Sequence, residues 1–266
     1  MSGTDPGDVA RHADALWDAA SSRIAIKPLT LDNPELSIAD AYAIQLANVD
    51  RAVAGGRRIV GHKVGLTSKA MQEMLGVDEP DFGVLLDDMV LPDDSTVAPG
   101  RLLQPRVEAE IAFRLGRDLH GPGVSTEDAL AAIEVAIPSL EIIDSRIADW
   151  QIRLADTIAD NGSSAMVVLG ADETPVQDLD LRLIGAIVEH NGALVEHGVG
   201  AAVLGHPARC VAWLANKLAE FDQGLFAGQI VMPGAVHRAV TVAPGDVVRA
   251  VFDRLGPVTV HFGAEK

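Results

Sequence analysis

The first third of the chain has apolar residues at helical spacing. In DVARHADALWDAASS the apolar positions recur three or four residues apart, which predicts an amphipathic helix. A second helix is expected to begin after Ser37, because Asp40 follows three positions later in a capping-box pattern. It should end at the pair Gly55 and Gly56, since glycine is the usual residue just past a helix.

After residue 57 the pattern changes to short β-rich runs separated by clusters of Gly, Pro and Asp. These runs predict strands at 58–66, 84–91, 106–115, 139–145, 165–170, 183–190, 229–232, 247–252 and 257–262. Two helices are expected among them, one from Ser125 to about Ala136, before Pro138, and one in PARCVAWLANKLAEF. Because strands dominate and do not alternate strictly with helices, the pattern favours an antiparallel or mixed β core over a doubly wound parallel sheet.

Composition narrows the class of partner. The 266 residues are 48% hydrophobic, enough for a sizeable core, and 21 Lys and Arg against 38 Asp and Glu give a net charge of −17. That charge disfavours nucleic acid and anionic membranes as partners and leaves a small molecule or a metal. Cys210 is the only cysteine, which fits a reducing compartment. Without a secretory leader or a long apolar stretch, the sequence predicts a soluble cytoplasmic protein.

Two glutamates stand one residue apart in the apolar run LQPRVEAEIAFRLGRD. In a strand, Glu108 and Glu110 would share one face, and Glu141 lies in a second apolar run, AIPSLEIIDSR. Three carboxylates from two strands would suit a hard divalent cation such as Mg²⁺ or Mn²⁺. The spacing alone leaves an alternative open, in which the first two glutamates face water and Glu141 pairs with Arg106 or Arg146.

Lys63 lies in a β-type run, GHKVGLTSKAM, between Gly61 and Gly65. A lysine in such a run usually extends its ammonium group to the surface, and this is the expectation from the residues alone. The other interpretation is a desolvated lysine near the metal that moves a proton or holds a substrate carboxylate. His62 would face the opposite side of the strand and is predicted to be structural.

The sequence has no motif for a nucleotide or for a covalent acyl intermediate. The glycines of HGVGAAVLGHP fit neither phosphate-binding spacing, and no G-x-S-x-G turn is present. The polar, turn-rich segments GVDEPDFGVLLDDM and DTIADNGSSAMVV, both flanked by strands, are candidates for binding loops.

Taken in order, six motifs resemble one family from about residue 30 to residue 262. They are GHKVGLTSKAMQ, DEPDFGVLLDDM, QPRVEAEIAF, PSLEIIDSRIADW, DTIADNGSS and GHPARCVAWLANKL. Together they resemble the 2-keto-4-pentenoate hydratases (2-hydroxypenta-2,4-dienoate hydratases) of the fumarylacetoacetate hydrolase superfamily. The resemblance implies an α+β fold, a mixed β-roll of the fumarylacetoacetate hydrolase C-terminal-domain type with a helical N-terminal part. Residues 1–56 would form that helical segment, and residues 57–266 the metal-binding catalytic domain.

The resemblance also implies roles for particular residues. Glu108, Glu110 and Glu141 match the family's metal ligands, and Lys63 and Asp81 match residues at its active site. Three further residues in or beside the matching motifs are predicted to contact substrate: Leu86, Ser163 and Ser164.

The implied reaction is addition of water to 2-hydroxypenta-2,4-dienoate or a substituted analogue, giving 4-hydroxy-2-oxopentanoate in aromatic degradation by meta-cleavage. The metal would stabilise charge on the 2-oxygen, with Lys63 as proton shuttle or carboxylate contact and Asp81 or Asp160 as general base. The family also implies a closed homo-oligomer, with a pathway aldolase or decarboxylase as a further partner.

Three alternatives remain. 2-Oxo-3-hexenedioate (4-oxalocrotonate) decarboxylases share most of the motifs but often carry HPK before the glutamate pair, where this chain has QPR. 2-Oxohept-4-ene-1,7-dioate hydratases are also similar, although their usual longer stretch before DTI is missing here. From a different class, a non-catalytic assembly subunit is disfavoured because Lys63 and the three glutamates are all present.

Overall fold

The computed structural model describes residues 6–68, 72–73, 77 and 79–264. Part of the GHKVGLTSKAMQ motif therefore lies outside the described residues. Among the described helices, none is long and apolar enough to cross a membrane.

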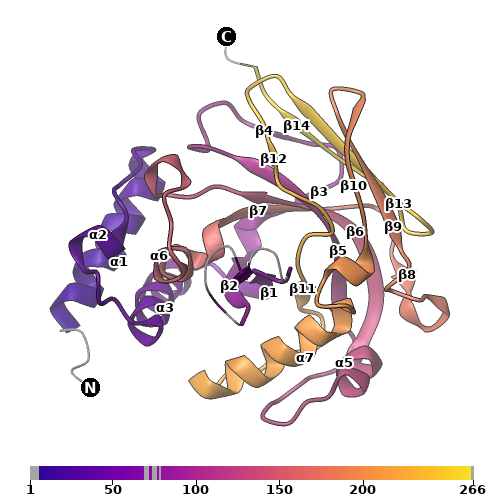
Figure 1. Ribbon diagram of the computed structural model, residues 1–266, viewed down its shortest axis with the longest axis horizontal. Coiled ribbons are helices and arrows are strands. Elements are labelled where there is room, and N and C mark those ends of the chain that lie inside the picture. Colours follow the sequence, from indigo (N-terminus) through magenta and orange to yellow (C-terminus); the bar gives the residue numbers. More distant parts are fainter. Residues whose placement is uncertain (1–5, 69–71, 74–76, 78, 265–266) are drawn as a thin grey trace.

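Three helices come first in the chain and gather at one side of the β-rich body, beside a later helix, α6 (Figure 1). They are α1 (Pro6–Ser22), α2 (Leu29–Asp32) and α3 (Ile38–Ala54), and α6 spans Leu154–Ala159. The predicted start and end of the second helix are confirmed, because the Ser37 side chain accepts a hydrogen bond from the Asp40 backbone and Gly55 follows the last helical residue. The division of the chain at residue 56 stays a prediction.

The large sheet of the described chain has nine strands with the central order β2-β1-β11-β5-β6-β7-β3, and β12 and β8 pair at its margins. Its strands are β1 (Ile59–Gly65), β2 (Asp81–Leu86), β3 (Val90–Pro92), β5 (Arg106–Leu115), β6 (Ile133–Ile143), β7 (Ser164–Leu169), β8 (Thr174–Pro175), β11 (Ile230–Met232) and β12 (Val240–Thr241). Both parallel and antiparallel pairs occur, since β1 and β11 run parallel whereas β5 and β6 run antiparallel. The mixed sheet confirms the predicted fold class.

A second, five-stranded sheet has the order β10-β9-β13-β14-β4. Its strands are β4 (Ser95–Val97), β9 (Gly185–His190), β10 (Ala193–Val199), β13 (Val247–Phe252) and β14 (Gly256–Phe262). Two helices, α5 (Thr126–Ala132) and α7 (Pro207–Leu218), pack together on another side of the body (Figure 1).

The main core fills the space between the two sheets. Alternate residues of β5 and β6 point into it, including Ile111, Phe113 and Leu140, and they meet residues of the second sheet such as Val248 and Val258. The intervening residues of β5 and β6 point to the opposite face of the large sheet, as a period of two requires. That opposite face carries the three glutamates.

Two predictions of element bounds are wrong. The strand expected at 84–91 is instead β2 and β3, with a short helical turn at Asp87–Met89 between them. The helix that begins after Ser125 ends at Ala132, and residues 133–138, expected as its last turn and a break, belong to β6. Pro138 is tolerated inside this strand because it lies between the residues that pair with β7 and those that pair with β8. Its missing N–H therefore breaks no ladder bond.

Candidate active site

Three carboxylates meet on one face of the large sheet. Glu108 and Glu110 point to the same side of β5, and Glu141 lies directly opposite Glu108 in the register of β5 with β6. One oxygen from each of the three lies within 4.8 Å of the others. Antiparallel pairing thus places like charges at a separation that is unfavourable unless protons or a cation compensate them.

Burial of the three carboxylates makes their mutual repulsion more unfavourable. Glu110 and Glu141 are buried, and Glu108 is half-buried. Burial, and then the charge of Glu141, raises the pKa of Glu108 to about 7. The pKa of Glu110 is raised well above its ordinary value by the same two causes, and burial raises that of Glu141 against the opposing charge of Lys63.

The carboxylate oxygens differ in their hydrogen bonding. Oε2 of Glu110 accepts a 2.8 Å bond from the Gly234 backbone N–H, which fixes the orientation of that side chain. Both oxygens of Glu141 are buried without a hydrogen-bond partner in the described part of the chain. Unpartnered buried carboxylate oxygens in a cluster of three are the donor set that a hard divalent cation prefers, so the residues fit a metal of this kind.

Within the described chain, Lys63 places a cation beside the three carboxylates. Its Nζ lies 3.7 Å from Oε2 of Glu141 and donates a 2.9 Å hydrogen bond to the carbonyl of Gly162. Burial alone would lower the pKa of Lys63, but the neighbouring carboxylates, Glu141 foremost, raise it overall. The expectation from the residues alone, that this lysine reaches the surface, is wrong, because its exposed fraction is 4%.

Asp81 begins β2 and lies opposite Gly65 of β1. A Cβ atom on Gly65 would stand 2.2 Å from Oδ1 of Asp81 and 3.1 Å from Nζ of Lys63, so glycine leaves room for both groups. Oδ1 of Asp81 is buried without a hydrogen-bond partner in the described segments. Burial raises the pKa of Asp81, and Lys63 opposes the shift. A buried carboxyl group with a shifted pKa beside a charged partner is a candidate for proton transfer.

The floor beneath the charged groups is apolar. A separate cluster of buried side chains lies on this face of the large sheet, drawn from β2, β5, β6, β7 and β11. Its buried members are Leu85, Ala112, Ile137, Val167, Ile230 and Met232. This floor lowers the local dielectric, which is why burial is the leading cause of the raised carboxyl pKa values.

A turn of left-handed residues holds the carbonyl that Lys63 uses. Asn161, Gly162 and Ser163 have φ values of 57°, 60° and 54°. The side-chain amide of Asn161 pins the turn to β2 by accepting from the Val84 N–H at 2.8 Å and donating to its carbonyl at 3.0 Å. The segment ADNGSS thus acts mainly through its backbone, and nothing in its composition reveals that role.

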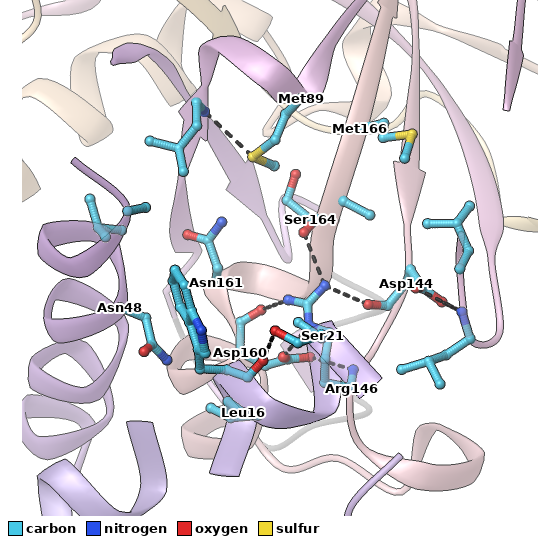
Figure 2. Close-up of a pocket in the computed structure, with 18 of the residues that line it drawn as sticks. Leu16, Ser21, Asn48, Met89, Asp144, Arg146, Asp160, Asn161, Ser164 and Met166 are labelled. Atoms are coloured by element: carbon cyan, nitrogen blue, oxygen red, sulfur yellow. Dashed lines mark hydrogen bonds and ion pairs between the residues drawn. The ribbon is translucent and has the colours of Figure 1, made fainter. Parts of the chain in front are cut away.

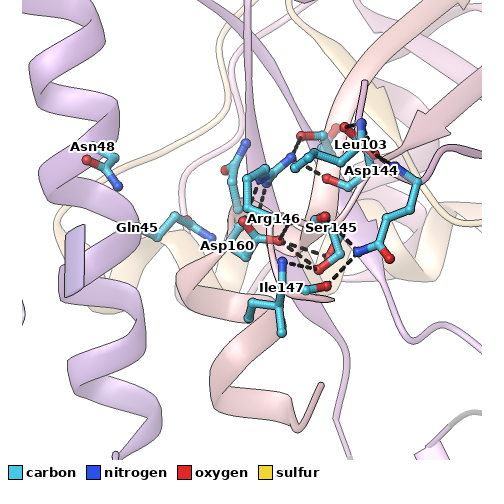
Figure 3. Close-up of polar contacts among 12 residues, drawn as sticks. Gln45, Asn48, Leu103, Asp144, Ser145, Arg146, Ile147 and Asp160 are labelled. Carbon is cyan, nitrogen blue, oxygen red and sulfur yellow. Dashed lines mark hydrogen bonds and ion pairs between the residues drawn. The ribbon is translucent and has the colours of Figure 1, made fainter. Parts of the chain in front are cut away.

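Asp160 is directed to a different partner. Its carboxylate accepts hydrogen bonds from the Arg146 backbone N–H at 3.0 Å and from the Arg146 Nε at 2.5 Å, and from the Ser145 hydroxyl at 3.2 Å (Figure 3). Arg146 is thereby occupied, and Arg106 stacks over Trp150 with its guanidinium carbon 4.4 Å from the ring centroid. The alternative in which one of these arginines pairs with Glu141 is therefore wrong.

The three residues predicted to contact substrate lie in different environments. Ser164 begins β7, and its hydroxyl acts to lower the pKa of Glu141, so it borders the carboxylate cluster. The Ser163 hydroxyl donates to Asp160 at 3.4 Å. The Leu86 side chain packs beside Val49 and Ala52 of α3, on the side of β2 away from the carboxylates.

The fold and the site together define a class of protein. It is a mixed-sheet protein with a carboxylate cluster suited to a divalent cation, beside a buried lysine and aspartate. The chain belongs to the fumarylacetoacetate hydrolase family, because residues 53–262 match the model described as "Fumarylacetoacetate (FAA) hydrolase C-terminal".

Individual relatives cover nearly the whole chain. It is 45% identical to the "TodF product hydratase" of Pseudomonas putida, over 96% of this chain and 96% of that one. It is 44% identical to a "2-keto-4-pentenoate hydratase" of Paraburkholderia xenovorans, over 94% and 93%. Among solved structures, a 4-oxalocrotonate decarboxylase from Pseudomonas putida G7 in complex with magnesium and adipate has a TM-score of 0.96, 39% identity, and coverage of 98% of this chain and 100% of that one.

Proposed function

We propose that this protein is a divalent-metal-dependent hydro-lyase that adds water to 2-hydroxypenta-2,4-dienoate or a substituted analogue, giving 4-hydroxy-2-oxopentanoate. The observation that carries the proposal is the convergence of three carboxylates within 4.8 Å beside the buried Lys63. The names of the relatives that span the chain support the substrate class.

Glu108, Glu110 and Glu141 would hold the cation, Mg²⁺ or Mn²⁺. When bound, this ion supplies positive charge for the substrate's carboxylate and 2-oxygen. The fixed geometry of β5 and β6 orients the three ligands before substrate arrives, and the apolar floor excludes water from the side of the sheet.

The position of Lys63 suits it to bind a negatively charged group of the substrate. Its raised pKa keeps the ammonium group protonated at neutral pH, and its bond to Gly162 aims it along the carboxylate cluster. We assign it to bind the anionic end of the substrate, where a desolvated ammonium interacts strongly.

Asp81 suits the proton transfers better than Asp160 does. In the reaction the 2-hydroxyl loses a proton and C5 gains one, forming a 2-oxo-3-enoate; water then adds its oxygen to C4 as C3 gains a proton. Asp81 has an unpartnered oxygen and a raised pKa beside Lys63, so it can take the proton from the attacking water. The Asp160 carboxylate is already held by Arg146.

The test is product identification with freshly generated 2-hydroxypenta-2,4-dienoate and its analogue carboxylated at C5, after chelation and with added Mg²⁺ or Mn²⁺. A 4-hydroxy-2-oxo acid formed only with metal supports the proposal. Release of CO₂ from the carboxylated analogue would instead indicate a decarboxylase, the activity named for the structure with a TM-score of 0.96.

Two pairs of variants test the assigned residues. Glu141→Gln is expected to lose metal affinity and turnover, whereas Glu134→Gln, an exposed glutamate of the same strand, should keep both. Asp81→Asn should lower turnover by about 10²–10⁴ with the fold intact. Asp160→Asn should mainly lower the melting temperature, because it leaves Arg146 without its carboxylate. The reverse pattern would assign the base to Asp160.

A further inference from the structure

A second pocket adjoins the carboxylate cluster at Ser164 but is lined otherwise by different residues. It encloses about 330 Å³ between α1, α3, the segment 101–103 and the start of β7 (Figure 2). Leu86 lines it from β2, and because Leu86 and Asp81 are five residues apart in one strand, their side chains lie on opposite faces of β2. Neither Lys63 nor any of the three clustered glutamates lines this pocket. The volume is at the lower end of the range for small-molecule sites.

Most of the pocket wall is apolar. The side chains come from α1, α3, β2, β7 and the short turn after β2, and they include an indole ring and two thioethers, which adapt readily to a planar or irregular ligand. The principal apolar lining residues are Leu16, Trp17, Val49, Leu86, Met89 and Met166. Such a wall favours a ligand with an apolar body.

Two amide side chains that line this pocket, of the buried Gln45 and the half-buried Asn48, have unused acceptor oxygens. The Gln45 side chain is 1% exposed and donates from Nε2 to the carbonyls of Phe82 and Ile158, both at 2.9 Å, so its orientation is fixed. Asn48 is fixed in the same way by a 2.9 Å bond from Nδ2 to the carbonyl of Ala13. Oε1 of Gln45 and Oδ1 of Asn48 are buried without a hydrogen-bond partner among the described residues.

The opposite wall offers a third polar group. Ser164 is buried at the boundary between this pocket and the carboxylate cluster, where its hydroxyl also acts on Glu141. Figure 2 shows Asn48 projecting from α3 on one side and Ser164 and Met166 from β7 on the other. Because buried polar atoms are normally satisfied, these acceptors indicate a ligand that carries a hydroxyl donor.

Four arginines line the pocket, and two of them are neutralised by carboxylates. Nε of Arg57 lies 3.3 Å from Oδ2 of Asp88, and Arg146 is paired with Asp160.

The other two arginines, Arg23 and Arg101, are exposed where they line the pocket. Neither has an ion-pair partner in the segments that the structure describes. These two guanidinium groups favour an anionic ligand.

We propose that this pocket is a second binding site, for a small amphipathic organic acid that carries both a carboxylate and a hydroxyl group. Its apolar body lies against Trp17 and Met166, its hydroxyl donates to the amide oxygen of Asn48, and its carboxylate faces Arg101.

The experiment is calorimetric titration of the Mg²⁺-loaded protein with 4-hydroxybenzoate, benzoate and phenol. 4-Hydroxybenzoate is expected to bind one molecule per chain with a Kd of about 10⁻⁴–10⁻³ M, reasonable for so small a ligand. Benzoate, which lacks the hydroxyl, and phenol, which lacks the charge, should each bind about 5–10-fold more weakly.

Substitutions of residues in and outside the pocket show where 4-hydroxybenzoate binds. Ala20→Phe fills the pocket from α1 and should abolish binding, whereas Ala43→Phe, on the exposed side of α3, should not. Asn48→Leu should reduce 4-hydroxybenzoate affinity to that of benzoate and leave benzoate unchanged. Arg101→Gln should weaken both acids, and more so at low salt. A normal melting curve for each variant excludes misfolding.

The Glu108→Gln variant distinguishes binding in this pocket from binding at the metal centre. This variant should bind 4-hydroxybenzoate as the wild type does. The inference is overturned by the absence of binding at 10 mM ligand, on the order of ten times the weakest expected Kd. It is also overturned if Glu108→Gln loses binding while Ala20→Phe keeps it, since the acid would then occupy the metal site. Because no turnover is measured, failure of the proposed hydratase activity would not affect this result.

Discussion

At the scale of single residues, two neighbours in β1 have opposite surroundings. Lys63 faces the carboxylate cluster, whereas the ring of His62 lies on the other side of the strand, with its centroid 6.4 Å from that of Phe82. Alternation along the strand was predictable from the sequence, and so was a structural role for His62. The burial of Lys63 was not, because the carbonyl that binds it belongs to Gly162, 99 residues away.

Replacing Lys63 by Met is expected to reduce turnover while the metal-loaded protein keeps its stability. Methionine retains an apolar stem and removes only the charge that binds the anionic end of the substrate. Turnover should fall by about 10²–10³, the usual effect of removing one preorganised donor. Steady-state kinetics and melting curves with saturating Mg²⁺ provide the measurement. Lys217→Met, which removes a lysine of α7, is the control; equal turnover in both variants would deny Lys63 a role in the reaction.

His62 is expected to make the protein sensitive to acid. Burial lowers its pKa from 6.5 to about 4, so between these values the unfolded chain takes up a proton that the folded protein does not. Its contribution to stability is therefore intact above pH 6.5 and is lost as the pH falls toward 4, by roughly 3 kcal/mol in total.

Urea unfolding at a series of pH values measures this effect. His62→Gln should flatten the fall in the free energy of unfolding between pH 6.5 and 4, whereas the exposed His197→Gln should not. An unchanged slope in His62→Gln would assign the acid sensitivity to other groups.

At the scale of elements, β1 is joined to β11 by an unusually close approach of two backbones. A Cβ atom on Gly61 would lie 2.0 Å from the carbonyl oxygen of Ile230, its partner in the parallel register. This contact places Lys63, two residues on, over the carboxylate cluster. The glycines of GHKVG were visible in the sequence, but which of them meets a neighbouring strand depends on β11, more than 160 residues later.

Gly61→Ala should therefore separate β1 from β11. The clash is with backbone atoms, so the expected result is a large loss of stability, above about 3 kcal/mol, or failure to fold. Gly185→Ala, in β9, is the matched control, because the nearest atom to its added methyl group is 4.0 Å away. Comparable melting temperatures for the two variants would show that separating β1 from β11 does not lower the stability of the fold.

At the scale of the whole molecule, the second sheet exposes several large apolar side chains on a face that also carries Glu189 and His197. Ile187 is 43% exposed, Leu194 63% and Val199 38%, and the pairing of β9 with β10 places all three on one face. β10 was not predicted from the sequence, since ALVEHGV mixes exposed apolar and charged residues without alternation. An exposed apolar face at the edge of a sheet is typical of a contact between subunits.

This surface is expected to join copies of the chain into a homo-oligomer. Sedimentation of the wild type should give a mass well above the 27.9 kDa of one chain, and Leu194→Lys should lower it. Ile24→Lys, at an exposed apolar residue on the helical side, should leave the mass unchanged. If Ile24→Lys dissociates the assembly and Leu194→Lys does not, the contact lies on the helical side.

The direct opposition of Glu108 and Glu141 limits how this protein can change in evolution. A deletion or insertion of one residue between Glu108 and the end of β5 would turn one of the opposed side chains toward the main core, so the length of that strand is constrained more tightly than its composition. The connection from Gly116 to Ser125 is free of this constraint apart from the pairing of Leu119 with Leu225, because it lies beyond the residues of β5 and β6 that pair with each other. Differences in length among descendants of this protein should therefore accumulate in that connection and be absent from the two strands.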